Sequence, residues 1–198
     1  MVCVEQGTAG SGKMIVVASR TFPLLVCAVL ATASPAQASH WGFESDAIGW
    51  ATGGYHGSAW FGTEQVRVRI VKALFYAPQF TVPEGFERLR NDVWEFFVDV
   101  AWRPPQARFG GLWTGVGLEL YDREIRDKSS GTDATYDALE LALRTGYIWR
   151  PFNAGFYVNP WLGLNVRLDG DASVLVGERT YSAPRLSPLA SLKLGWQF

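Results

Sequence analysis

Hydrophobic and polar residues alternate with a period of two along several long runs of the chain. In residues 94–102 one side carries Trp94, Phe96, Val98, Val100 and Trp102, and the other carries Glu95 and Asp99. Similar alternation covers residues 112–120, 139–149 and 156–168. A period of two places successive side chains on opposite faces of an extended strand. These four runs therefore predict β-strands with one apolar and one polar face.

The predicted strands are long for a soluble protein. Soluble strands usually have about five or six residues, whereas a tilted strand needs roughly 9–11 residues to cross the hydrocarbon of a membrane. Four less regular segments, at residues 53–61, 66–75, 172–181 and 186–198, bring the count to eight. The sequence predicts an all-β fold, a closed antiparallel up-and-down transmembrane β-barrel of eight strands.

Two features of these segments are irregular. In residues 172–181 either phase of the alternation puts a charge, Glu178 or Arg179, on the apolar face. Pro160 and Pro188 fall inside predicted strands although proline has no N–H to donate to the ladder. We expect β-bulges or strand ends at both prolines.

The first 38 residues have the layout of a secretory signal peptide. The apolar run at residues 22–33 follows Lys13 and Arg20, and Ala36 and Ala38 are small residues suited to signal-peptidase cleavage. We expect residues 1–38 to be removed, residues 39–198 to form the barrel domain, and the chain to be exported through the periplasm. A lipoprotein anchor at Cys27 is disfavoured, because Val26 stands where such sites have a small residue.

Composition narrows the chemistry of the mature chain. Both cysteines, Cys3 and Cys27, lie in the segment expected to be removed, which excludes disulfides and thiolate metal sites. Without that segment 16 Lys and Arg face 18 Asp and Glu, so no nucleic-acid partner is expected. No mature segment has the 18 or so apolar residues of a membrane helix, and no cofactor motif is present.

The end of the chain carries a recognisable pattern. Ala190, Leu192, Leu194, Trp196 and Phe198 share one face of the last strand, and Phe198 is the final residue. This resembles the C-terminal signature of bacterial outer-membrane β-barrel proteins, which the barrel-assembly machinery reads. The resemblance implies location in the bacterial outer membrane of a Gram-negative cell, with outer-membrane lipids and the assembly machinery as partners. We expect a monomer.

Two observations test this interpretation further. Trp102, Tyr147, Trp149, Trp196 and Phe198 lie near strand ends, as in an aromatic girdle at the membrane interface. Counting strands back from the C-terminus, however, puts the longer connections, residues 77–91 and 121–135, on the periplasmic side, where such barrels have short turns.

A soluble periplasmic barrel of lipocalin type, with apolar residues inside, is the alternative. The glycines of the polar face (Gly115, Gly117, Gly146, Gly163 and Gly195) favour the membrane barrel, since a narrow interior has little room.

The polar faces predict a charged barrel lumen. Its members are Arg67, Arg69, Glu95, Asp99, Glu119, Glu140, Arg144, Arg167 and Lys193. Unpaired charges in so narrow an interior are costly, so these residues should pair across strands, Arg67 or Arg69 with Glu95 or Asp99. Such a network fills the barrel; the alternative is a narrow, gated solute channel. An eight-stranded barrel is normally filled by side chains.

Candidate catalytic or metal-binding residues are few. His56 and Ser58 share one strand face, and a His-x-Ser pair resembles the motif of outer-membrane lipid A deacylases, which implies a lipid-modifying hydrolase. That family carries the pair near its end, and no acid is placed to complete it here. His40 has no ligand spacing around it, and Asp169-Gly170-Asp171 reads as a turn. The predicted function is a structural, binding or envelope-maintenance barrel without evident chemistry.

Overall fold

The computed structural model describes residues 39–102, 108–152, 154–169 and 173–198. Its elements in chain order are β1 (His40–Asp46), α2 (Ala47–Ala51), β2 (Tyr55–Gly62), β3 (Val66–Tyr76), η1 (Gln79–Thr81), β4 (Phe86–Trp102), β5 (Gly111–Asp127), β6 (Asp133–Ile148), β7 (Phe156–Arg167), β8 (Ser173–Val176), β9 (Arg179–Ser182) and β10 (Leu186–Gln197). In these residues no helix is both long and apolar enough to cross a membrane.

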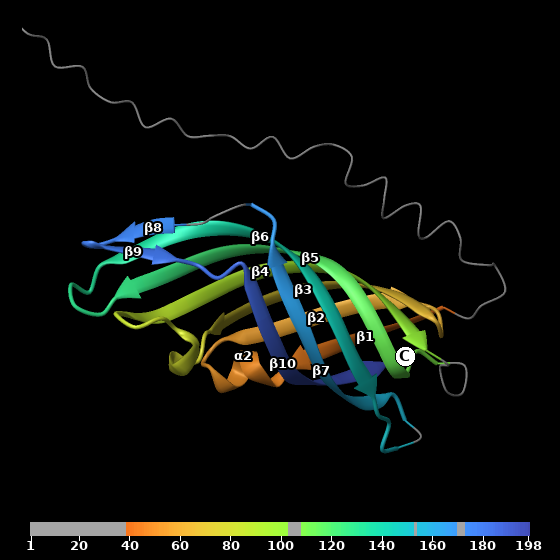
Figure 1. Cartoon of the computed structure of the whole chain (residues 1–198). Helices are drawn as coiled ribbons and strands as arrows, with labels where there is room; N and C mark the ends of the chain where they lie inside the picture. The colour runs from red at the N-terminus through yellow and green to blue at the C-terminus, as the bar shows by residue number, and fades with distance from the viewer. Residues whose placement is uncertain (1–38, 103–107, 153, 170–172) are drawn as a thin grey trace, which may run out of the picture. The chain divides into compact units, whose positions relative to one another are not determined.

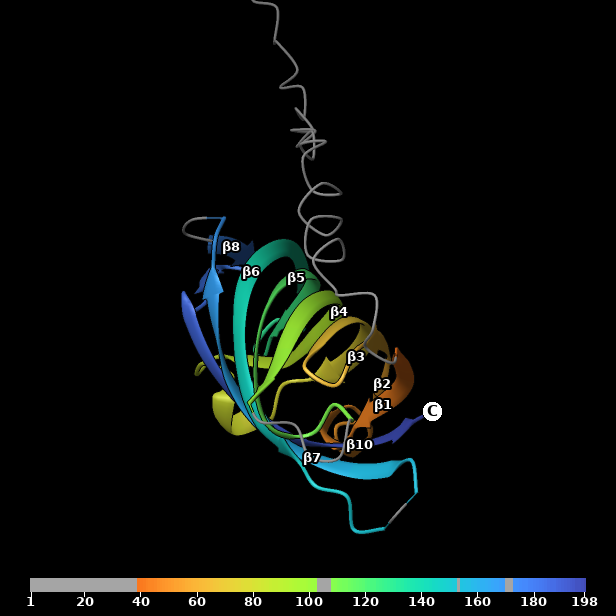
Figure 2. The same ribbon diagram turned by 90° about the vertical axis from the view of Figure 1, so that its right-hand side faces the viewer.

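Eight of the strands form a closed antiparallel barrel, which confirms the predicted fold. The ring runs β1-β10-β7-β6-β5-β4-β3-β2 and closes where β1 pairs with both β10 and β2. Strands that are consecutive along the chain are neighbours in the ring, except that β8 and β9 come between β7 and β10 in the sequence. Figure 2 shows the ring nearly end-on. Closure gives each strand a partner on both sides, so the barrel has no free edge over the shared height of its strands.

The strand count was right, but two assignments were wrong. Residues 173–182 form a separate β8–β9 hairpin outside the ring, because Gly177, with a φ of 62°, turns the chain back after four residues. The missing barrel strand is β1, where Trp41, Phe43 and Ser45 alternate with buried Gly42, Glu44 and Asp46. With seven residues directly after the expected cleavage site, β1 is too short to stand out in the sequence.

This correction removes the topological conflict seen in the sequence. The chain enters β1 at the end of the barrel where β10 finishes, here named the C-terminal end. The short turn at residues 63–65 lies at this end, whereas residues 77–85 and the hairpin of β8 and β9 lie at the opposite end (Figure 1). The strand bounds show that the two longest connections between barrel strands, β3 to β4 and β7 to β10, run between strand ends away from the C-terminus, as in outer-membrane barrels with a periplasmic C-terminus.

The two strand prolines lie in regular register, without the expected bulges. Pro160 pairs with Leu192 of β10, but on its other side it falls in a gap between the β6–β7 pair Gly146–Trp161 and the single bridge Trp149–Val158. Pro188 pairs with Leu164 of β7 and lies beyond the part of β10 that pairs with β1. Each proline is thus paired with a strand on one side only, so the N–H that it lacks is not needed for a hydrogen bond on the other side.

Candidate functional site

The outward face of the barrel carries a belt of apolar side chains. On β4, β5 and β6 it spans residues 94–102, 112–120 and 139–147, where the outward residues are Leu, Val, Phe, Trp and Tyr apart from Thr114 and Thr145. At the border of the belt away from the C-terminal end, Asp92, Asp122 and Asp137 lie directly beside one another on the same three strands. Nine residues at about 3.3 Å each, tilted by about 40°, cover roughly 23 Å, close to the apolar band of membrane barrels.

Aromatic residues ring the belt at the C-terminal end, as the sequence predicted. The exposed fractions of Trp102, Tyr147, Trp149, Trp196 and Phe198 lie between 45% and 59%. Phe198 also stacks on Trp41 of β1 with ring centroids 4.2 Å apart, and its N–H donates to the Trp41 carbonyl at 2.9 Å. Phe198 therefore stabilises the contact between β1 and the end of β10, where the barrel closes.

Aromatic side chains close the lumen near the C-terminal end. Trp60, Phe109, Trp113 and Tyr157 are at most 4% exposed, and they pack as one cluster. The Trp60 indole N–H donates to the Tyr157 hydroxyl at 2.9 Å, and the Arg67 guanidinium carbon lies 4.4 Å from the centroid of the Phe109 ring. Cation and rings thus fill this level of the barrel together.

Above the rings lies the first of two buried ion clusters. Arg67 donates to Glu44 and to Asp99, both at 2.8 Å, and Arg69 donates to Asp99 at 3.1 Å. The expected pairing across β3 and β4 is therefore present, but its acid is Asp99, and Glu95 takes no part. The register explains this, because Arg67 stands directly opposite Asp99 whereas Val71 stands opposite Glu95.

The second ion cluster joins β5, β6 and β7. Arg144 binds Glu119, and Arg123 binds Glu140 at 2.7 Å. Asn165 donates to both carboxylates, and the Tyr121 hydroxyl donates to Glu119 at 2.7 Å. Glu119 and Glu140, which are directly opposite on neighbouring strands, are thereby each given a cation and shared amide donors. Like charges at such close range would otherwise repel.

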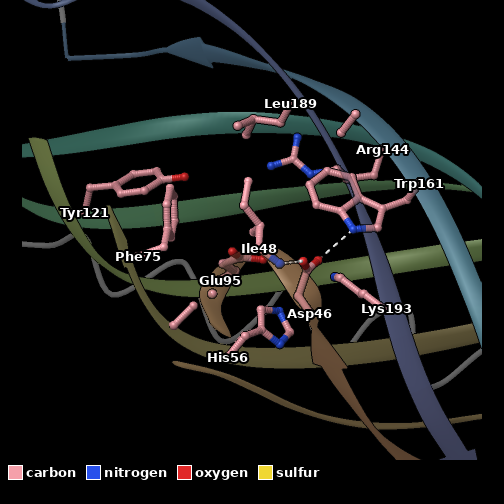
Figure 3. A pocket seen from close by; sticks show the side chains of 13 residues that line it. Asp46, Ile48, His56, Phe75, Glu95, Tyr121, Arg144, Trp161, Leu189 and Lys193 are labelled. Atoms are coloured by element: carbon pink, nitrogen blue, oxygen red, sulfur yellow. Dashed lines mark hydrogen bonds between the residues drawn. The ribbon is translucent and has the colours of Figure 1, made fainter. Parts of the chain in front are cut away.

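A small cavity of about 40 Å³ lies in the lumen beside Arg144 of the second cluster (Figure 3). Lys193, Glu95, His56 and Asp46 line it, under the short helix α2. Asp46 accepts hydrogen bonds from the Trp161 indole and from the N–H of Ile48, so it caps the helix as well. Among the described residues no ion pair within 4.0 Å is found for Lys193 or Glu95. The volume suffices for one or a few water molecules, which could join these groups.

All nine predicted lumen residues point into the barrel, and all except Glu95 are less than 9% exposed. His56 and Ser58 also point inward, at 8% and 5% exposure, so the predicted shared face is correct. His56 Nδ1 and Ser58 Oγ are buried without a hydrogen-bond partner among the described residues. Among the described residues no carboxylate bonds to the imidazole, and both side chains point into the lumen, away from the lipid. This arrangement offers no support for acyl hydrolysis.

Several lumen residues escaped the sequence analysis. Glu44 and Asp46 were missed together with β1, and Arg123 because it lies beyond the predicted run 112–120. Asn159 and Asn165 lie on the polar face of the run 156–168, but being uncharged they were not included in the predicted charge network. The described residues contain no cluster of three or more His, Cys, Asp or Glu that could hold a metal. Of the Asp169-Gly170-Asp171 motif, residues 170 and 171 lie outside the described part of the chain.

The opposite end of the barrel is closed by a separate apolar cluster. Val82, Phe86, Ile125, Val176 and Tyr181 are at most 8% exposed. They join the upper ends of β4 and β5 to the η1 connection and the β8–β9 hairpin, which lies at the far end from the C-terminus in Figure 1. The residues of this cluster therefore pack the η1 connection and the β8–β9 hairpin against the ends of β4 and β5.

Comparisons with solved structures return outer-membrane proteins. The N-terminal β-barrel domain of Pseudomonas aeruginosa OprF is 14% identical, with a TM-score of 0.49 over 81% of this chain and 96% of that one. A major outer membrane protein of Thermus thermophilus is 12% identical, with a TM-score of 0.48 over 81% and 100%. Neisserial surface protein A is 10% identical, with a TM-score of 0.44 over 80% and 92%. No family model and no curated protein matches the chain.

Proposed function

We propose that the chain is a bacterial outer-membrane barrel that serves the envelope as a structural or binding protein. The observation that carries the proposal is the belt of outward apolar residues, nine residues high, bounded by the row Asp92, Asp122 and Asp137. In water this surface would be a very large exposed apolar patch, whereas in a bilayer it is solvated. The charged interior argues equally against a lipocalin-type barrel, whose apolar residues point inward.

The interior supports a closed barrel rather than an open pore. In the part of the chain that the structure describes, the lumen holds six cations (Arg67, Arg69, Arg123, Arg144, Arg167 and Lys193) and six carboxylates (Glu44, Asp46, Glu95, Asp99, Glu119 and Glu140). Aromatic rings close one end and the Val82–Tyr181 cluster closes the other. With its lumen closed, the protein has two surfaces on which it can bind a partner. These are the lipid-facing belt and the end of the barrel that carries η1 and the β8–β9 hairpin. Contacts with envelope components would be made there.

The C-terminal phenylalanine provides the test of location. Deleting Phe198 from the full chain should lower assembly into the outer membrane while export continues, because it removes both the assembly signal and the stack on Trp41. Cell fractionation and heat-modifiable electrophoresis measure the result. Trp41→Ala is the matched control, since it removes the stack and leaves the signal. Undiminished outer-membrane barrel after deletion of Phe198 would contradict the proposal.

A narrow channel is the second candidate, favoured by the cavity beside Lys193 and Glu95. The wild-type chain in a planar lipid bilayer should show no steady conductance, because the packed levels on either side of the cavity block ions. Steady single-channel steps would replace the structural proposal with the channel.

A further inference from the structure

One glycine on the lipid-facing side of the barrel lacks the reasons that explain the others. Nine glycines lie in described strands, and seven of them would place a Cβ under 3.0 Å from neighbouring atoms. Gly111 has a positive φ of 70°. Gly57 has neither constraint, since a Cβ there would find no atom within 4 Å. A glycine in the middle of a strand often marks close approach of a ligand or another backbone.

Gly57 lies in a shallow groove on the outer surface. The groove has a volume of about 410 Å³ and crosses β2, β1 and β10, with Phe43, Leu194 and Trp196 among its lining residues. Tyr55 and Phe61, outward residues of the same strand, are large, so the floor at Gly57 and Ser45 is a depression in an otherwise bulky belt. In the β2–β3 ladder Gly57 stands opposite Lys72, at the upper border of the belt.

The chemistry of the floor selects a hydrocarbon occupant. The Ser45 hydroxyl donates to the His56 carbonyl at 2.7 Å and accepts from the Trp50 indole N–H at 2.7 Å, so it has no donor left for a ligand. Each strand beneath the groove pairs with both of its neighbours. Beyond the last β1–β2 pair, Glu44–Ser58, the His56 carbonyl accepts from Ser45, so no edge is left for an added peptide strand. Glu44, His56 and Ser58 also line the groove, but their side chains point into the lumen and these residues are at most 8% exposed. The surface open to a ligand is therefore mainly apolar, which favours an alkyl chain.

We propose that this groove seats one acyl chain of a membrane phospholipid. The inference rests on the proposed function, because the groove must face lipid for the chain to enter. The groove is continuous with the apolar belt, so an acyl chain would enter it from the hydrocarbon of the membrane. Gly57 is then retained because any side chain would occupy the space of the acyl chain.

The test fills the groove and counts bound lipid. The full chain and two variants, Gly57→Phe and Val116→Phe, are produced with export, extracted, and reconstituted into vesicles of phosphatidylethanolamine and phosphatidylglycerol. Native mass spectrometry after mild detergent release counts the retained phospholipids. Val116 is an outward belt residue of β5, 47% exposed, so its variant adds the same ring away from the groove. Gly57→Val is a smaller second variant.

The expected result is one retained phospholipid for the wild type and for Val116→Phe, and its loss in both Gly57 variants. Heat-modifiable migration should be unchanged, and stability should not fall, because glycine weakens a strand. Equal retention in all four proteins, or none in the inserted wild type, would overturn the inference. A change of oligomeric state in the Gly57 variants with lipid retained would overturn it in favour of a protein contact. Failure of the wild type to enter vesicles would instead defeat the proposed function.

Discussion

At the scale of single residues, the lumen is built by pairing small residues with large ones. A Cβ at Gly115 would collide with Asp99, one at Gly117 with Phe97, and one at Gly163 with Arg144. The sequence predicted that these glycines face a crowded interior, which is correct. It could not predict which charges meet, because a period of two fixes the face of each residue but not the register between strands.

Asp99 and Glu95, on the same face of β4, test which acid pairs with the arginines of β3. Asp99→Asn should lower the free energy of unfolding by about 3–5 kcal/mol, because Arg67 and Arg69 lose their shared carboxylate in a dry site. Glu95→Gln should cost far less, since it breaks no ion pair among the described residues. Urea unfolding of the barrel in lipid vesicles measures both. Equal losses would mean that Arg67 and Arg69 do not depend on Asp99.

Leu141 tests the outward face in the same way. It points away from the lumen inside the belt on β6, so Leu141→Arg should cost about 2–4 kcal/mol near the middle of the membrane. Thr135→Arg is the control, because Thr135 is outward on the same strand but lies beyond the row of aspartates. The folding free energy in vesicles gives both values. If the two changes cost the same, residues 139–147 do not face hydrocarbon.

At the scale of elements, predictability follows the length and regularity of the alternation. The long runs in β4, β5, β6 and β7 were predicted because they repeat their pattern over many residues. β1 was missed because it is short and directly follows the expected cleavage site. The β8–β9 hairpin was read as one strand because alternation continues across a tight turn, and the charges at Glu178 and Arg179 were the sign of that turn.

The turn between β5 and β6 makes a pH-dependent prediction outside the belt. Asp127 accepts hydrogen bonds from the hydroxyls and backbone N–H groups of Ser129 and Ser130, and the Ser129 hydroxyl most of all lowers its pKa to about 2. An unfolded aspartate has a pKa near 3.9. The contribution of this turn to stability should therefore be complete above pH 4 and be lost as the pH falls towards 2.

Amide hydrogen exchange of Ser129 and Ser130 measures this contribution. Exchange, corrected for its intrinsic pH dependence, should accelerate as the pH falls from about 4 to about 2. In Asp127→Asn it should be fast at every pH, since the amide has one neutral acceptor in place of a carboxylate. Protection that is independent of pH in the wild type would show that the carboxylate does not order the turn.

At the scale of the whole molecule, stability depends on closing the ring, because an unpaired strand in hydrocarbon leaves backbone donors and acceptors without partners. The lumen carboxylates of β1 reinforce this closure. Glu44 accepts from Arg67 of β3 and from the Tyr157 hydroxyl of β7, and Asp46 accepts from Trp161 of β7 and from Ser191 of β10. The shortest barrel strand thus holds distant strands together from inside.

Two deletions test which strands the barrel needs for insertion, those of the ring or those of the β8–β9 hairpin. Removing residues 173–182 deletes the hairpin but leaves all eight barrel strands, and the adjacent ends of β7 and β10, paired through Val166 and Leu186, can be joined by the remaining residues. This variant should still insert and show heat-modifiable migration, with some loss of stability because Val176 and Tyr181 leave the apolar cluster. Removing residues 40–46 takes a strand of the ring away and should abolish insertion. Electrophoresis with and without heating, after reconstitution into vesicles, distinguishes them. If the hairpin deletion fails and the β1 deletion inserts, then residues 173–182 supply the eighth strand in the membrane, and the closure through Glu44 and Asp46 is not what holds the barrel.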